Sequence, residues 1–543
     1  MLSCLVGVIA ATANAQTKQG QGKENAERWP WRQFIETDFP FFSTTFDGSP
    51  KSGDRLDENV VPRAMVFPLA GDCFVAYDID LLRVAAVWTA GDMPFVNANL
   101  AVTSYPYELK KVAPGTDALP QPNGEIWFRN GLYAGVGTGE PRILDPRPKR
   151  TDEERVVHGG LDSKLARFLG VDLTRGEIEY QVGGGRVRER FERERQGFIR
   201  HLQVSPHDDP IFLVLARDSG DIEFQCRGGA IKILDEHVVC CIEPSEQVRD
   251  VSVSHVRIQP AKTGDPIPAS SSGLRESSEL RWKQAVRRAL PEPPSQSGLR
   301  IEEIPLPIEN PYGRAVRPAD VNFFAEGRAA VVTVDGDVWL CEGLQPGSRE
   351  VVWRRFASGL HEPLSIRIRD EQVFVFDRSG LWRLLDRDGN GEADYHELFC
   401  SRIHQTAETR EFPLSLELEN EGSFLVSKPG QEGVFSAVLR ISPDGSDVEL
   451  IASGFRQPYL GYDPATGRIV ASDQQGNWVP SSPVHLIRPG AFYGFRRSES
   501  LDDLPVTPPL TWIPHAECGS ATSVVWMRNA KMGPLNEKPI LLS

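Results

Sequence analysis

Residues 361–384 read HEPLSIRIRDEQVFVFDRSGLWRL, in which three strand-like runs are separated by a polar turn and a glycine turn. Similar text begins at Arg317 (RPADVNFFAEGRAAVVTVDGDVWL), Arg410 (REFPLSLELENEGSFLVSKPG) and Phe455 (FRQPYLGYDPATGRIVASDQQGNW), so that successive starts are 44, 49 and 45 residues apart. A repeat of about 40–50 residues that holds several short strands is typical of the blades of a β-propeller. Since each blade buries its faces against its neighbours, a propeller explains this period better than a sandwich.

The repeats predict a β-propeller over residues 301–543. A fifth start, SATSVVWM at Ser520, is followed by only a short run. Closing six blades at this period needs on the order of 250 or more residues, slightly more than follow residue 300. We therefore expect a six-bladed type of propeller that is incomplete at its C-terminal end, in a shortened member of its architecture.

The front half also consists of short alternating strands. Residues 29–258 hold runs such as AMVFPLAGDCFVAYDIDLLRVAAVW and PIFLVLARD, bounded by Gly, Pro and Asp, which predict a β-sandwich-like domain. Residues 259–300 are rich in Pro, Ser and charge, and we interpret them as a linker with one short helix around Ser278–Leu290. The predicted fold class is therefore all-β.

Composition limits the partners. The 543 residues are enough for two large domains. The chain has 60 Lys and Arg against 75 Asp and Glu, a net charge of −15. This charge repels phosphate backbones and anionic lipid, so the composition argues against nucleic acid and membrane surfaces as partners.

The N-terminus reads as an export signal. Residues 2–15 (LSCLVGVIAATANA) are apolar and end in Ala13-Asn14-Ala15, which fits signal-peptide cleavage before Gln16. We therefore expect a signal peptide at residues 1–15 and a secreted or periplasmic protein. No other stretch approaches the roughly 20 apolar residues of a membrane span, so no membrane insertion is expected after cleavage.

The cysteines point to no metal or haem site. Their wide scatter argues against a disulfide framework, and the sequence has no C-x-x-C or paired His spacing for zinc. Cys240 and Cys241 stand in an apolar run (HVVCCIE) and are more typical of a core than of a redox site. The sequence contains no C-x-x-C-H, so we expect no haem in this chain.

One acidic loop has the spacing of a calcium site. Asp386, Asp388, Asn390, Asp394 and Glu397 surround Gly391, and oxygen ligands at alternate positions around a glycine turn fit one cation. Strand-like text flanks the loop, so it would be a structural calcium turn inside a propeller hairpin. The alternative is a plain Asp/Asn/Gly turn whose acids are solvated.

The repeats resemble the glucose/sorbosone dehydrogenase family, whose propellers use pyrroloquinoline quinone. The resemblance covers Glu302 to the end and rests on residues 358–384, with Gly-Leu-x-x-Pro before a glycine hairpin, and on residues 454–495 (GFRQPYLGYDPATGRIVASDQQGNW…LIRPGAFYGF). It implies a sugar- or alcohol-oxidising activity with quinone and calcium as cofactors.

The same resemblance implies the cofactor contacts. Arg456 matches the family's quinone-binding arginine, and Gln457 replaces its asparagine. Gln475 and Gly476 match the turn that holds the catalytic calcium. Residues 478–482 (WVPSS) stand where the family has acids, so calcium at this turn would be weak, because calcium prefers carboxylates.

The family's general base has no direct counterpart. The family places a histidine ahead of the strand that corresponds to Leu414–Leu418, whereas this chain has Arg410 there, and an arginine stays protonated at neutral pH. Glu411 and His404 are the nearby residues that could replace it. Activity would then be weak.

The front half resembles an uncharacterised domain. Residues 60–91, Asp145-Pro146-Arg147 and residues 179–184 (EYQVGG) are similar to a domain at the head of large secreted proteins of planctomycete-type bacteria. There it precedes such a propeller and often a C-terminal cytochrome c module. The resemblance implies a cytochrome c partner or a missing C-terminal module, but no mechanism.

Two functions remain open from the sequence. The first is a quinoprotein-like dehydrogenase that oxidises a sugar or small alcohol and passes electrons to a cytochrome c; the second is a non-catalytic propeller that binds carbohydrate or another protein. His361 and His515 precede propeller strands and face either the central channel or a surface turn. We interpret Asp78 and Asp80, on one face of a strand near Arg83, as partners in salt bridges rather than a glycosidase pair.

Overall fold

The computed structural model describes residues 39–49, 59–69, 72–90, 94–96, 119–147, 159–194, 196–258, 279–292, 302–407, 411–429, 436–475, 480–495, 504–528 and 533–542. These residues form sheets that are antiparallel except for the parallel pairing of β30 with β34, and one short 3₁₀ helix (η5, Gly533–Leu535); there is no α-helix among them. The all-β prediction is confirmed. No helix in the described part of the chain is long and apolar enough to cross a membrane.

The front half contains two small sheets and a pair of short strands. One sheet has the order β1-β2-β3-β4-β7: β1 (Phe42–Asp47), β2 (Val60–Pro68), β3 (Cys73–Asp78), β4 (Arg83–Thr89) and β7 (Glu125–Arg129). The other has the order β15-β16-β13-β8: β15 (Ala230–Leu234), β16 (His237–Ile242), β13 (Ile211–Arg217) and β8 (Val136–Thr138). The pair consists of β5 (Phe95–Val96) and β6 (Gln121–Pro122).

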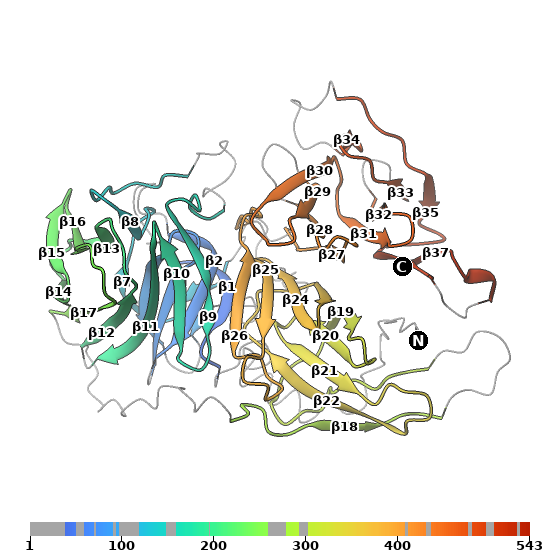
Figure 1. The fold of residues 1–543 in the computed structure, drawn as a ribbon, viewed down its shortest axis with the longest axis horizontal. Helices are drawn as coiled ribbons and strands as arrows, with labels where there is room; N and C mark the ends of the chain where they lie inside the picture. The colour runs from blue at the N-terminus through green and yellow to red at the C-terminus, as the bar shows by residue number, and fades with distance from the viewer. Residues whose placement is uncertain are drawn as a thin grey trace.

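The third sheet of the front half continues into the propeller (Figure 1). Its ten strands, in order, are β14 (Ile222–Arg227), β17 (Arg249–Arg257), β12 (Gly197–Val204), β11 (Gly185–Glu194), β10 (Glu177–Val182), β9 (Ala166–Asp172), β26 (Tyr395–Cys400), β25 (Gly380–Leu385), β24 (Gln372–Asp377) and β23 (Ser365–Arg369). The two halves meet where Gly170 of β9 pairs with Glu397 of β26. A Cβ on Gly170 would lie 2.3 Å from the carbonyl oxygen of His396, so only glycine fits this close approach.

The second half has the strand order of a propeller. In addition to β23–β26, its sheets contain, in spatial order, β18 (Val286–Ala289), β22 (Glu350–Ala357), β21 (Val338–Glu342), β20 (Ala329–Thr333) and β19 (Pro318–Phe323); β27 (Ser415–Leu418), β28 (Phe424–Pro429), β29 (Ser436–Ile441), β30 (Val448–Ser453) and β34 (Ala491–Phe492); β31 (Pro458–Asp463), β32 (Arg468–Asp473), β33 (Ser481–Leu486) and β35 (Thr511–Pro514); and β36 (Ser523–Trp526) with β37 (Pro539–Leu542). The first strands of successive sheets, β19, β23, β27, β31 and β36, are neighbours in that order. Sheets that follow one another with their first strands side by side are blades around a common axis.

An aspartate repeats at, or two residues after, the end of the second strand of three blades. Asp335, Asp377 and Asp473 each accept a hydrogen bond from the backbone N–H that precedes the blade's first strand, with donor–acceptor distances of 3.0, 2.8 and 2.9 Å. The three donors are the N–H groups of Arg317, His361 and Arg456. Because a buried N–H needs a partner, this contact fixes the start of each blade and accounts for part of the sequence period.

The helix expected around Ser278–Leu290 is wrong in the described part of that segment. Val286–Ala289 form β18 instead and pair with β22 at the outer edge of the first blade. Trp282, just before it, is buried and stacks on Phe39 at 5.9 Å. An unpaired sheet edge offers backbone partners that outweigh a weak local helix preference.

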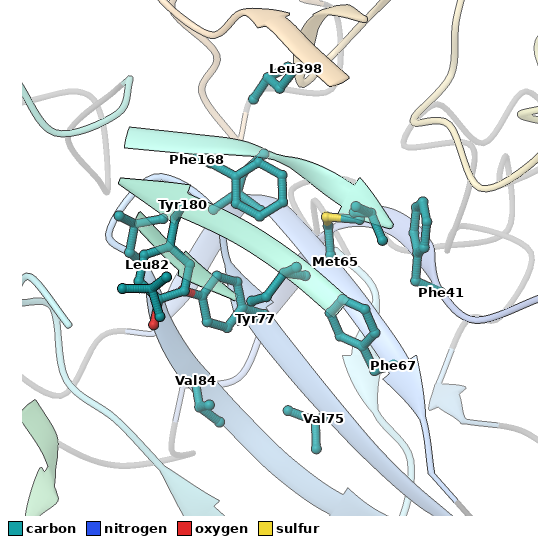
Figure 2. Packing of buried hydrophobic residues seen from close by; sticks show 14 of the residues in the cluster. Phe41, Met65, Phe67, Val75, Tyr77, Leu82, Val84, Phe168, Tyr180 and Leu398 are labelled. Atoms are coloured by element: carbon teal, nitrogen blue, oxygen red, sulfur yellow. The ribbon is translucent and has the colours of Figure 1, made fainter. Parts of the chain in front are cut away.

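The largest apolar core joins the two halves. Met65, Phe67, Val75 and Tyr77 of the first sheet face Tyr180 and other residues of the ten-stranded sheet (Figure 2). The same cluster includes Trp382 and Leu398 of the second blade, and the Trp382 ring lies edge-on to Phe168, with 6.5 Å between ring centroids. Shared burial of this kind makes the halves stabilise one another.

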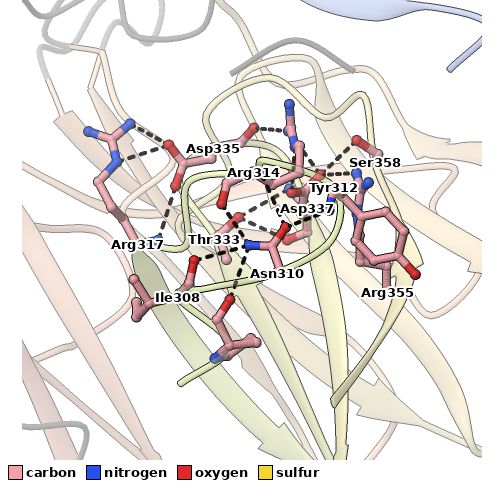
Figure 3. A network of polar contacts seen from close by, with 11 residues as sticks. Ile308, Asn310, Tyr312, Arg314, Arg317, Thr333, Asp335, Asp337, Arg355 and Ser358 are labelled. Atoms are coloured by element: carbon pink, nitrogen blue, oxygen red, sulfur yellow. Dashed lines mark hydrogen bonds and ion pairs between the residues drawn. The ribbon is translucent and has the colours of Figure 1, made fainter. Parts of the chain in front are cut away.

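The first blade contains a buried ionic network (Figure 3). The Asp337 carboxylate accepts hydrogen bonds from Arg314 at 2.9 and 3.0 Å, from Arg355 at 2.9 Å and from the Ser358 hydroxyl at 2.7 Å. Burial alone would raise the pKa of Asp337, but the charges of Arg314 and Arg355 hold it below its usual value. The network ties the segment before β19 to the blade and has a structural role.

Candidate functional site

Five ionisable side chains gather at the inner strands of the second and third blades. His361 and Glu362 precede β23, Arg378 follows β24, Glu411 precedes β27, and Lys428 lies in β28. Each is only 1% exposed. We call these five residues the ionic cluster. Charged groups are almost never so deeply buried unless they are paired or functional.

Glu411 connects the members of the cluster. Its backbone carbonyl accepts hydrogen bonds from Lys428 Nζ at 3.2 Å and from Arg378 at 3.4 Å. Its carboxylate accepts one from the backbone N–H of Thr406 at 2.9 Å. Arg378 also forms an ion pair with Glu362. The cluster is therefore held by contacts between two consecutive blades.

Three polar groups of the cluster retain free hydrogen-bonding capacity among the described residues. Glu411 Oε1 and His361 Nδ1 are buried and have no hydrogen-bond partner. Lys428 Nζ, which can donate three hydrogen bonds, makes one. Leaving a buried polar group unsatisfied costs about 1–3 kcal/mol, so these three groups are the cluster's candidates for contact with a polar ligand.

Burial makes the cluster able to exchange protons near neutral pH. It lowers the pKa of Lys428 to about 7; Glu411 opposes this shift, and the charges of Arg378 and Arg63 add to it. Burial and the cations Arg378, Lys428 and Arg63 hold the pKa of His361 well below its usual value. His361 is therefore neutral, and Lys428 can accept or release a proton.

The front half supplies a cation beside the cluster. Arg63 of β2 donates hydrogen bonds to the backbone carbonyls of Ser379 at 2.8 Å, Ser401 at 3.0 Å and Ile403 at 3.4 Å, all in the second half. It also pairs with Asp80. The electrostatics of the cluster thus depend on both halves of the chain.

The interpretation of Asp78 and Asp80 as salt-bridge partners is confirmed. Asp78 Oδ2 lies 3.2 Å from Arg83 Nε, and Asp80 pairs with Arg63. All four side chains are buried. These carboxylates therefore neutralise arginines inside the front half.

Of the two predicted bases, the structure places Glu411 in the cluster and His404 elsewhere. His404 lies beside Gly159 of the front half, where an added Cβ would be 3.3 Å from His404 Cδ2. Arg410 lies outside the described residues. Glu362, Arg378 and Lys428 were not predicted from the sequence. For Lys428 the sequence did offer an indication, because this lysine stands in the strand-like run FLVSKP, all of which is buried.

The residues predicted to contact a quinone hold a turn of the fourth blade together. The backbone N–H groups of Arg456 and Gln457 donate to the Asp473 carboxylate at 2.9 and 2.6 Å. The Arg456 guanidinium donates to the backbone carbonyl of Gln474 at 3.2 Å and to its side-chain oxygen at 3.3 Å. These contacts are internal to the fourth blade.

The described part of the predicted calcium turn offers few carboxylate ligands. Gln475 adopts a left-handed backbone conformation with φ of 64°, its N–H lies 3.4 Å from the Ser482 hydroxyl, and Gly476 lies outside the described residues. The nearby carboxylate of Asp473 already accepts backbone N–H groups, and burial raises its pKa to about 6. Among the described residues of this turn, hydroxyls stand where calcium would need carboxylates.

The acidic loop at 386–394 brings three of its predicted ligands together. Carboxylate oxygens of Asp386, Asp388 and Asp394 lie within 4.8 Å of one another. Asp394 Oδ1 is buried without a hydrogen-bond partner in the described part of the chain, and burial raises the Asp394 pKa. The Asn390 N–H donates to Asp386 and Asp388 at 3.0 and 3.1 Å. The expectation that Glu397 joins them is not met, because its carboxylate pairs with Arg383 in the neighbouring strand.

This loop borders the junction between the halves. A cavity of about 330 Å³ lies beside it, lined by Asp172, Thr174, Arg175 and Arg188 of the front half and by Arg387, Asp388 and Asp394. Arg387 lies 3.6 Å from Asp172 and stacks on the Tyr395 ring at 3.5 Å. A change in the loop would therefore affect the pairing of β9 with β26.

Comparisons with known proteins identify one domain and several similar folds. Residues 75–189 match the model of DUF6797, a domain of unknown function. This confirms the resemblance of the front half to an uncharacterised domain for those residues. No curated protein matches the chain.

The solved structures with a similar fold include proteins described as sugar dehydrogenases. A glucose dehydrogenase-type oxidoreductase from Thermus thermophilus is 18% identical, with a TM-score of 0.32 over 39% of this chain and 74% of that one. The PQQ-bound aldose sugar dehydrogenase of Streptomyces coelicolor is 15% identical, with a TM-score of 0.30 over 45% and 76%. The PQQ domain of Coprinopsis cinerea pyranose dehydrogenase is 10% identical, with a TM-score of 0.31 over 39% and 69%.

Proposed function

We propose that this chain binds a neutral, hydroxyl-bearing small molecule, a sugar or alcohol, at the ionic cluster. The observation that carries the proposal is the set of free polar groups on Lys428, Glu411 and His361. A hydroxyl both donates and accepts hydrogen bonds, so it can pair with the Lys428 amine or ammonium, with Glu411 Oε1 and with either tautomer of His361.

The balance of charges favours a neutral ligand over an anion. Arg378 is paired with Glu362, and Arg63 with Asp80. Among the described residues of the cluster, Lys428 is then the remaining cation, and the negative charge of Glu411 acts on it. An anionic ligand would meet as many negative charges as positive ones. We therefore expect carbohydrate rather than phosphate or carboxylate compounds.

Oxidation of the bound hydroxyl is the second candidate function, and Lys428 favours it. Removal of hydride from an alcohol requires a base within hydrogen-bond reach, and such assistance is worth about 10²–10⁴ in rate. Lys428, with its pKa near 7, can take the hydroxyl proton, and Glu411 stabilises the ammonium ion that forms. The neutral His361 would orient the hydroxyl.

The quinone implied by the family resemblance fits these residues poorly. Pyrroloquinoline quinone carries several carboxylates, whereas Arg378 and Arg63 are already neutralised, and Arg456 is held in its own turn. A bound quinone would supply the two-electron acceptor for oxidation.

The remaining expectations are part of the same proposal. We propose that the protein is exported, on the apolar run 2–15, and that a cytochrome c is the electron acceptor if oxidation occurs. We also propose that Asp386, Asp388 and Asp394 bind a structural calcium ion, supported by their convergence and by the free Asp394 Oδ1.

A binding experiment tests the proposal. Purified chain is titrated calorimetrically with neutral mono- and oligosaccharides and small polyols. Removing the Lys428 donor in Lys428→Met lowers the affinity by roughly 10–100-fold, because a hydrogen bond to a charged group contributes about 1.5–3 kcal/mol. The control Lys232→Met removes an exposed lysine of β15 and leaves the affinity unchanged.

Adding quinone and an electron-accepting dye separates the two functions. Dye reduction that Lys428→Met abolishes supports oxidation, and binding without dye reduction supports the non-catalytic propeller. Equal affinities for the parent and Lys428→Met, or binding of sugar phosphates in preference to sugars, would place the ligand elsewhere.

A further inference from the structure

Two cysteines of the front half, from two different sheets, have their sulfur atoms in contact. Cys226 lies in β14, the edge strand of the ten-stranded sheet, and Cys240 lies in β16 of the four-stranded sheet. Their Sγ atoms are 3.2 Å apart. The chain between them turns at Gly228–Gly229 and runs through β15, so the sulfurs close a short loop across the corner of two sheets.

Gly229 leaves the space that the sulfurs occupy. A Cβ at this position would lie 2.8 Å from Cys240 Sγ and 3.2 Å from Cys226 Sγ. Cys241, the next residue along β16, belongs to a different apolar cluster from Cys240, because successive side chains of a strand point to opposite faces. The contact is therefore specific to Cys226 and Cys240.

The two thiols differ in accessibility and acidity. Cys226 is half-buried, and Cys240 is fully buried. The hydrogen bond from Cys240 lowers the pKa of Cys226 to about 7, and the same bond, together with burial, raises the pKa of Cys240. At neutral pH the reachable sulfur is thus the more nucleophilic one, and the sulfur behind it is protected.

We propose that Cys226 and Cys240 are a redox pair that forms a disulfide by exchange with an external disulfide, either a small molecule or a protein. The Cys226 thiolate attacks one sulfur of that disulfide, forms a mixed disulfide and releases one thiolate. Cys240 then loses its proton and attacks Cys226 Sγ, which forms the Cys226–Cys240 bond and releases the second thiolate. The protein loses two electrons and two protons, and the external disulfide is reduced to two thiols.

The Cys226–Cys240 disulfide requires little movement and would link the two sheets covalently. An S–S bond is about 2.05 Å long, so the sulfurs must approach each other by little more than 1 Å. The closed loop of residues 226–240 joins β14 to β16. Restricting that loop in the unfolded chain stabilises the folded front half. This inference does not rest on the proposed function.

The test is peptide mapping of the full folded chain. The reduced protein is treated with oxidised glutathione at pH 8, free thiols are blocked, and a digest is analysed without reductant. The expected product is a crosslinked peptide pair containing Cys226 and Cys240, lighter by two hydrogens than the reduced pair. Its formation raises the melting temperature by several degrees, and dithiothreitol reverses both changes.

Three variants sharpen the result. Cys226→Ser and Cys240→Ser abolish the crosslink, and the matched control Cys241→Ser retains it. In Cys240→Ser, glutathione remains attached to Cys226, because no second thiol displaces it. A parent protein in which both cysteines stay free thiols, or in which Cys226 keeps a stable glutathione adduct, would overturn the proposal.

Discussion

Replacing Arg63 by methionine should weaken the connection between the two halves. Arg63 is fully buried, donates to three backbone carbonyls of the second half and pairs with Asp80. Methionine fills much of the same space and makes none of these contacts. The substitution leaves the Asp80 charge buried without its cation.

The size of the effect follows from that burial. Breaking a buried ion pair by removing one partner costs about 3–5 kcal/mol, since the remaining charge is uncompensated. For a domain of 150–250 residues this corresponds to a fall in melting temperature on the order of 10 °C. The double variant Arg63→Met/Asp80→Leu should recover part of the loss, because it removes both charges.

Thermal and urea unfolding of the full chain measure the effect. The control Arg287→Met breaks a pair with Glu350 whose side chains are 60% and 51% exposed, and such pairs contribute at most about 1 kcal/mol. The reasoning is refuted if Arg63→Met and Arg287→Met unfold alike. It is also refuted if adding Asp80→Leu deepens the loss instead of reducing it.

Three further outcomes are expected. The free energy of unfolding of the parent, relative to that of Lys428→Met, rises between about pH 7 and 10, because in that range the unfolded lysine keeps its proton and the buried amine has lost it. Urea unfolding of both proteins at several pH values measures this difference, and parallel pH curves would contradict it. Asp388→Ala lowers the melting temperature in calcium but not in chelator, whereas Glu397→Gln leaves the calcium-induced shift intact; loss of that shift in Glu397→Gln would return Glu397 to the site. Gly170→Ala destabilises the junction because its Cβ would meet a carbonyl oxygen at 2.3 Å, whereas Gly184→Ala, with open space around it, does not; equal melting temperatures would disprove the close contact.

The blades could be predicted from the sequence because their signal is local and repeated. Each blade repeats its own contacts: the backbone at the start of three blades donates to an aspartate of the same blade, namely Asp335, Asp377 and Asp473. The repeat in the sequence therefore has the same period as these contacts. Strand β18 could not be predicted in this way. Its pairing with β22 depends on an open sheet edge more than 60 residues away, which local propensity does not register.

The candidate site was only partly predictable for a similar reason. Glu411 was found through a family position, but its neighbours Lys428 and Arg378 come from other strands, and only the folded sheets bring them together. The acidic loop was found in part because its converging ligands, Asp386, Asp388 and Asp394, lie close together in sequence. Glu397 was included incorrectly, since the spacing could not reveal that it faces Arg383 on the next strand.

The front half influences the ionisation of the ionic cluster through charge. Arg63 crosses from β2 to the second half, and its positive charge helps to lower the pKa of Lys428. If that charge is removed, the pKa of Lys428 rises and a smaller fraction of the amine is unprotonated at neutral pH. The front half can therefore tune a site that it does not itself contain. This coupling gives a physical reason for the two halves to share one sheet and one core.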